Sequence, residues 1–116
     1  MAAKVDPAKL ARQARDLIEE YNRVLLDDAD DLSAPALSEA TRVLKSLVDR
    51  LPQAFEQTAD VLEMLASQDR VTTGQGDPRT GAATTAAELR AVAAGAGKLA
   101  EDLSHPVSAL FLMGGR

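Results

Sequence analysis

Cysteine is absent from this chain of 116 residues, and histidine occurs once, at His105. Without cysteine there can be no disulfide, thiolate nucleophile or iron–sulfur cluster, and a single histidine cannot assemble a zinc site of the usual Cys/His kind. The sequence therefore excludes the commonest redox and zinc-dependent chemistry. We expect neither a metal nor a cofactor.

Aromatic and β-branched residues are also scarce, with one Tyr, two Phe, no Trp, one Ile and eight Val. Because these residues favour pleated sheets, a β-rich fold is nearly excluded. Alanine and leucine, which are strong helix formers, supply 22 and 16 residues. The composition predicts an all-α protein with a thin, aliphatic core.

Positive charge is in deficit. The chain has 13 basic and 18 acidic residues, a net charge of −5, which is opposite in sign to what binding to a phosphate backbone needs. No stretch approaches the roughly 18 to 20 apolar residues that span a bilayer, and the first seven residues lack an apolar signal segment. We expect a cytoplasmic protein that binds neither nucleic acid nor a membrane.

Apolar residues recur every three or four positions in three stretches, which is the spacing of amphipathic helices. They predict helices at about 7–28, 34–67 and 82–104. Asp6-Pro7 and Ser33-Ala34-Pro35 are helix-start signals. Residues 68–81, rich in glycine and small polar residues, predict a mobile surface loop, and a short apolar segment at 106–113 follows a break before Pro106.

The predicted middle helix carries the strongest periodicity and contains Pro52. Proline inside a helix costs ~3 kcal/mol, so this helix is either kinked or broken at Pro52, and its uninterrupted spacing favours the kink. Val48, Phe55 and Leu62 are expected to flank its buried stripe. The stripe itself is predicted to contain Leu37, Ala40, Leu44, Leu47, Leu51, Ala54, Thr58, Val61 and Leu65.

These elements predict one domain over residues 1–116, a three-helix antiparallel bundle with a long middle helix. A full break at Pro52 would instead give a four-helix bundle. On the third helix Ala87, Ala91 and Gly95 lie four residues apart, and such small residues let two backbones approach closely. We expect this face to contact a neighbouring helix of the same chain rather than a second copy.

Four carboxylates, Asp27, Asp28, Asp30 and Asp31, gather between the first two helices. Oxygen-rich loops can bind calcium, but no register through this run places the glycine and glutamate that an EF-hand loop needs. A solvated linker is the favoured interpretation. Docking of a basic protein is the main alternative.

His105 is the one side chain whose ordinary pKa lies near neutrality, which makes it the first candidate for acid–base or phosphotransfer chemistry. A phosphotransfer bundle would hold such a histidine in mid-helix, whereas Pro106 places this one at a helix break. A capping or surface histidine is the favoured interpretation. We assign no catalytic residue and expect the protein not to be an enzyme.

Leu110, Phe111, Leu112 and Met113 form an apolar tail. Consecutive residues project around much of a helix, so one neighbouring helix cannot bury all four. The tail either folds back over the end of the bundle or binds a partner, which includes a second copy.

The segment from Leu44 to Leu103 joins a Leu-Pro-Gln-Ala element at residues 51–54, a loop with glycine and Asp-Pro, and an alanine-rich helix. In this respect the chain resembles small uncharacterised all-helical proteins of high-GC Gram-positive bacteria. The resemblance implies a bacterial setting. It implies no activity and carries no functional residue to this chain.

The long apolar stripe is the main functional indication. Because the stripe from Leu37 to Leu65 is longer than either flanking helix can cover, we expect a non-catalytic helical protein–protein interaction module that associates as a homodimer. One alternative is an acidic accessory or inhibitory protein that binds a basic partner protein. A second is a small enzyme or phosphotransfer bundle that uses His105.

Overall fold

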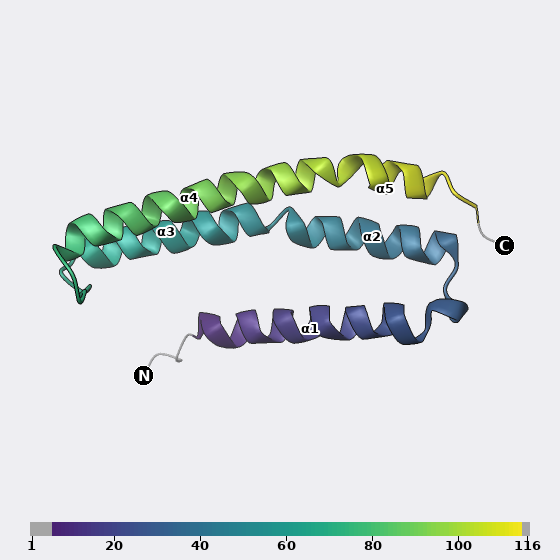
Figure 1. The fold of residues 1–116 in the computed structure, drawn as a ribbon, viewed down its shortest axis with the longest axis horizontal. Helices are drawn as coiled ribbons and strands as arrows, with labels where there is room; N and C mark the ends of the chain where they lie inside the picture. Colours follow the sequence, from purple (N-terminus) through teal and green to yellow (C-terminus); the bar gives the residue numbers. More distant parts are fainter. Residues whose placement is uncertain (1–5, 115–116) are drawn as a thin grey trace, which may run out of the picture. The chain divides into compact units, whose positions relative to one another are not determined.

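The computed structural model describes residues 6–114, and 82% of these residues are helical, with no strand among them. The predicted all-α class is confirmed. In chain order the elements are α1 (Pro7–Asp27), the short 3-10 turn η1 (Ala29–Asp31), α2 (Ala34–Val48), α3 (Leu51–Ser67), α4 (Pro78–Asp102) and α5 (Ser104–Phe111) (Figure 1). None of the helices within residues 6–114 has both the length and the apolar character needed to cross a bilayer.

The chain divides into two compact units, Met1–Ser33 and Ala34–Arg116. The first unit contains α1 and η1. Its helix begins where the sequence predicts, because the Asp6 side chain accepts a hydrogen bond from the backbone N–H of Lys9 at 3.2 Å and Pro7 occupies the first helical position. The expectation of a single domain stays a prediction. The expectation about a signal segment rests mainly on residues 1–5, which lie outside the described residues.

The second unit is an antiparallel helical hairpin. One arm consists of α2 and α3 and the other of α4 and α5, so that α3 packs against α4 and α2 packs against α5 (Figure 1). The connection is shorter than the predicted loop, because α4 begins at Pro78. The Asp77 side chain accepts from the backbone N–H of Thr80 at 3.0 Å and caps the helix. The predicted start at residue 82 is therefore wrong by four residues.

The first arm of the hairpin is interrupted near Pro52, but it does not reverse. Helix α2 ends at Val48, and α3 starts at Leu51 with Pro52 in its first turn, where the missing proline N–H costs no helical hydrogen bond. The two helices continue in the same general direction (Figure 1). The long middle helix is therefore interrupted and bent near Pro52, and of the two predicted alternatives the structure has the break into α2 and α3 rather than one continuous kinked helix.

The second arm has a similar interruption at Leu103. Helix α5 begins at Ser104 and ends at Phe111, so the expected segment at 106–113 starts two residues early and also ends two residues early. Pro106 lies in the first turn of α5, where, as at Pro52, an N–H has no helical partner to lose. The proline thus marks a helix start rather than the break itself.

Alanine forms the contact between the two arms. The buried hydrophobic residues among those described are all alanine, and we term this set the alanine seam: Ala59 and Ala66 on α3, with Ala82, Ala86, Ala93 and Ala100 on α4. Methyl groups of this size let helix axes approach closely. No large side chain in residues 6–114 is fully buried. The core is as thin as the composition predicts.

The predicted buried stripe is only partly buried. Leu47 is 41% exposed and Val61 49% exposed, whereas Leu51 and Leu65 of the same stripe are half-buried. Half-buried too are the residues expected beside the stripe, Val48, Phe55 and Leu62. The small residues Ala87, Ala91 and Gly95 are also exposed. An alanine-lined contact within the chain exists, but the predicted residues do not form it.

Candidate interaction surface

One side of the hairpin carries an ion-pair cluster that joins its arms. The Arg90 guanidinium on α4 donates to Asp60 on α3 at 2.8 Å and also to Glu63 on the same helix. Hydrogen bonds to Glu63 and then Asp60 raise the pKa of Arg90 above its ordinary value. We term this the charged side of the hairpin, because its ion pairs bridge the two arms on one side of the alanine seam.

The opposite side of the hairpin is apolar. An α-helix turns by roughly 100° per residue, so residues on the side of the alanine seam away from Arg90 can be identified on both arms. We term the resulting surface the apolar face. It comprises Leu47, Leu51 and Leu65 on the first arm, with Val92, Leu99 and Leu103 on the second.

Half of these six side chains are strongly exposed. Leu47 is 41% exposed, Val92 50% and Leu99 51%, while the other three are half-buried. Val92 and Leu99 lie seven residues apart, two helical turns, and therefore project in the same direction. The predicted stripe of the middle helix thus contributes half of an exposed surface, and α4 supplies the other half.

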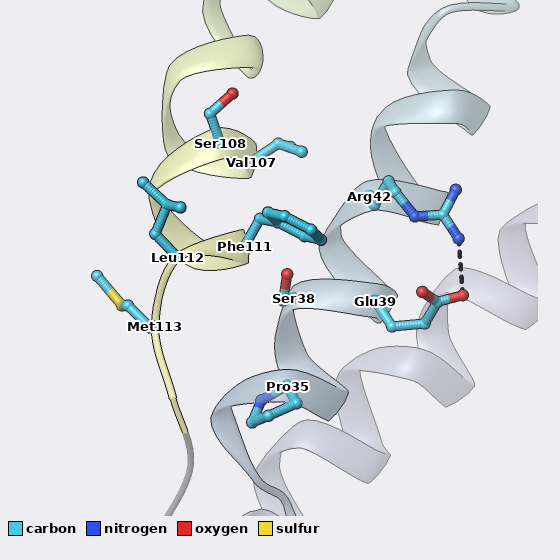
Figure 2. Close-up of a pocket in the computed structure, with 9 residues that line it drawn as sticks. All are labelled: Pro35, Ser38, Glu39, Arg42, Val107, Ser108, Phe111, Leu112 and Met113. Carbon is cyan, nitrogen blue, oxygen red and sulfur yellow. Dashed lines mark hydrogen bonds and ion pairs between the residues drawn. The ribbon is translucent and has the colours of Figure 1, made fainter.

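A cleft of about 500 Å³ lies at the open end of the hairpin, between α2 and α5. In Figure 2 the Phe111 ring points from α5 toward α2, and Arg42 on α2 pairs with Glu39. The nitrogen and oxygen of this pair are 2.7 Å apart. The cleft is lined by Pro35, Ser38, Glu39, Arg42, Val107, Ser108, Phe111, Leu112 and Met113.

Three of the four predicted tail residues line this cleft. Phe111 is 77% exposed, Leu112 83% and Met113 54%, whereas Leu110 is half-buried. The tail therefore does not fold into a closed core within residues 6–114. Whether it binds a partner stays a prediction.

The run of four aspartates at residues 27–31 lies in the first unit. Asp27 ends α1, Asp28 follows it, and Asp30 and Asp31 belong to η1; all four are exposed. Across residues 6–114 no group of three or more His, Cys, Asp or Glu side chains is placed to hold a metal ion. His105 occupies the first turn of α5 and is exposed.

Sequence reasoning missed both the charged side and the α4 half of the apolar face. Arg90 is separated from its two carboxylate partners by 27 and 30 residues, so no local pattern indicates the cluster. Val92 and Leu99 lie in the predicted third helix, but the sequence alone does not show which of its adjacent faces meets a neighbouring helix. The buried alanines of α4 show which face meets α3.

Comparison of this chain with protein-family models, with curated proteins and with solved structures gives no match. The geometry of the hairpin is therefore the basis for the functional argument.

Proposed function

We propose that this chain is a non-catalytic helical protein–protein interaction module, acting in the cytoplasm, that binds its partner through the apolar face. The single observation that supports this proposal is the exposure of Leu47, Val92 and Leu99, each between 41% and 51%, on one side of the hairpin. Contiguous apolar surface of this kind is uncommon on monomers and often marks a binding surface.

The form of the face favours a helical partner. Its five leucines and one valine lie in two parallel rows, one on each arm, and the groove between two packed helices accepts the ridge of a third helix. The ion pairs of Arg90 lie on the other side of the hairpin, so docking here removes no described ion pair of that cluster from water. An apolar helix therefore fits this face better than a charged ligand does.

The alternative functions rest on the sequence alone. Binding of a basic protein by the acidic run, and chemistry at His105, draw on exposed residues with no assembled site around them. A salt-sensitive complex with a basic protein that is lost on replacing Asp30 and Asp31 by Asn would favour the acidic accessory function. Nucleic acid and membranes are not part of the proposal.

The proposal is tested with the full chain carrying Leu47→Ser and Leu99→Ser together. Leu26→Ser is a matched control, because Leu26 on α1 is an 80% exposed leucine that belongs neither to the apolar face nor to the apolar tail. Chemical cross-linking in cells that produce the chain, followed by urea unfolding of each purified variant, gives the two readouts.

We expect the double variant to lose the cross-linked complexes while its helical circular dichroism is kept, and the control to keep both. The reason is that serine removes apolar area from a surface that the hairpin itself leaves half open. The proposal fails if the double variant keeps every complex. It fails equally if the parent forms no complex and the two substitutions change only the free energy of unfolding.

A further inference from the structure

The apolar face has the size and charge pattern for one particular occupant. We propose that a second copy of this chain covers it, so that two hairpins pack face to face as a layer of helices on a layer of helices. This inference rests on the proposed function and names the partner. It concerns the same six residues, Leu47, Leu51, Leu65, Val92, Leu99 and Leu103.

The area of the face reaches the lower limit for a specific dimer. From Leu47 to Leu65 the first arm rises by about 1.5 Å per residue, roughly 27 Å, and two helices packed about 10 Å apart present a surface roughly 20 Å wide. The face therefore measures on the order of 540 Å² per copy, or about 1,080 Å² for two copies. A specific protein–protein interface buries at least about 1,000 Å² in total.

The charge pattern permits two identical faces to meet. Arg90, Asp60 and Glu63 lie on the charged side, and the outer side of α4 carries Lys98 and Asp102, which pair with each other at 3.1 Å. Glu88 is the acidic residue at one end of the face. Because a two-fold interface brings the same patch of both copies together, a charged patch would repel itself, whereas this apolar patch does not.

The thin core gives a second physical reason for a second layer. The seam buries methyl groups only, and no large side chain of residues 6–114 is fully buried. A facing hairpin would cover the exposed parts of Leu47, Val92 and Leu99 with its own apolar side chains, which also recur every three or four residues along each helix. The same half-exposed leucines then act as the core of the dimer.

The absence of cysteine makes a direct test possible. Two single-cysteine versions of the full chain are compared, Leu99→Cys on the apolar face and Ala91→Cys on the exposed outer surface of α4. Their rates of alkylation by a small maleimide are measured from about 0.1 to 100 µM protein, and light scattering gives the mass of the parent and of both variants over the accessible part of this range.

A second copy on the face slows alkylation of Leu99→Cys at least 10-fold as concentration rises, in step with a doubling of mass, and leaves Ala91→Cys unchanged. If cysteine at position 99 itself weakens the dimer, a second variant carries the conservative change Leu99→Met and has its single cysteine at Leu47→Cys. Its alkylation rate is compared with that of Ala91→Cys in the same way. A rate for Leu99→Cys that is low at every concentration, with a monomeric mass, shows that a segment of the same chain covers the face and overturns the inference.

Two further outcomes also overturn it. A dimer in which both cysteines react equally fast associates elsewhere, for example through Phe111 and Leu112. A monomer with freely reacting Leu99→Cys has no second copy on this face. In the last case the proposed function still stands if Leu47→Ser with Leu99→Ser abolishes a cross-linked complex with another protein, so the two failures are distinguishable.

Discussion

Replacement of Ala86 by leucine tests the central packing feature, the alanine seam. Ala86 is 0% exposed at the contact between α3 and α4, whereas its neighbour Ala87 is exposed. Alanine and leucine differ little in helix propensity, so the same change at the two positions separates the cost of packing from any effect on the helix. Leucine at 86 adds three carbon atoms where only a methyl group fits.

Overpacking of this kind typically costs about 1–3 kcal/mol, because the added atoms force side chains from their rotamers or push the helices apart. A change at an exposed site usually stays within about 0.5 kcal/mol. For a domain of this size each kcal/mol lowers Tm by roughly 4–8 °C.

The assay is urea unfolding followed by circular dichroism at one fixed protein concentration, since association adds to apparent stability. We expect Ala86→Leu to lower the free energy of unfolding by about 1–3 kcal/mol and Ala87→Leu to leave it nearly unchanged. Equal effects of the two substitutions would refute the alanine seam. The face of α4 that contains Ala87 and Ala91 would then be the one in contact with α3.

Gly95→Ala is expected to raise the free energy of unfolding by about 0.5–1 kcal/mol, because a methyl group there meets no atom within 4 Å and glycine is a poor helix former; a lower urea midpoint would contradict this. Asp77→Ala should lower the urea midpoint near pH 7, and this difference should shrink as the pH falls below about 4. Hydrogen bonds from Thr80 lower the pKa of Asp77 from 3.8. The stabilisation of the folded state by this carboxylate is therefore complete above the pKa of the unfolded state and is lost as the pH falls through the pKa of the folded state. A difference in urea midpoint between parent and variant that does not change from pH 7 to pH 2 would refute the cap. Leu47→Ala should lower the free energy of unfolding of the monomer by about 1 kcal/mol, because the side chain is 41% exposed. A decrease above about 3 kcal/mol, at a concentration where the chain is monomeric, would show that Leu47 is a core residue. Shortening residues 71–75 by three residues should leave the far-ultraviolet spectrum unchanged, since loop-closure entropy varies slowly with length, and a spectrum of an unfolded chain would show that the loop is structural.

The helical class and the position of α1 could be predicted because both depend on local signals. Composition alone favoured helices, and Asp6-Pro7 marked the start of α1. The same signal, Asp77-Pro78, lay within the predicted loop and was overlooked among the glycines around it. The helix-start signal at Asp77-Pro78 is as clear chemically as the one at Asp6-Pro7, but its place among glycines led to its assignment to the loop.

The turn of each helix about its axis could not be predicted from one sequence. On the first arm, large apolar residues occupy two adjacent faces, one through Leu47 and Val61 and the other through Val48 and Leu62. Both have three and four spacing, so periodicity does not separate them. The larger set of leucines was taken as buried, but the close contact selected alanine, because only small side chains allow two helices to approach this far.

The candidate surface was half predicted for the same reason. Leu47, Leu51 and Leu65 were recognised as one stripe, and its excess over what flanking helices could cover indicated an association surface. Val92 and Leu99 joined that surface only when the structure showed which face of α4 packs against α3, with Arg90 paired to Asp60 and Glu63 on the other side of the seam. Contacts between residues this distant in sequence arise from the tertiary fold, which local patterns do not contain.

A core made of methyl groups has a calorimetric consequence. Exposure of apolar surface raises the heat capacity on unfolding by about 0.45 cal/K/mol/Å², and exposure of polar backbone lowers it by about 0.26. When the alanine seam opens, much of the newly wetted surface is helix backbone, so the heat capacity increment per residue falls below the usual range of about 12–15 cal/mol/K. The plot of the free energy of unfolding of the hairpin against temperature is therefore only weakly curved, so that the temperatures of heat and cold denaturation lie far apart.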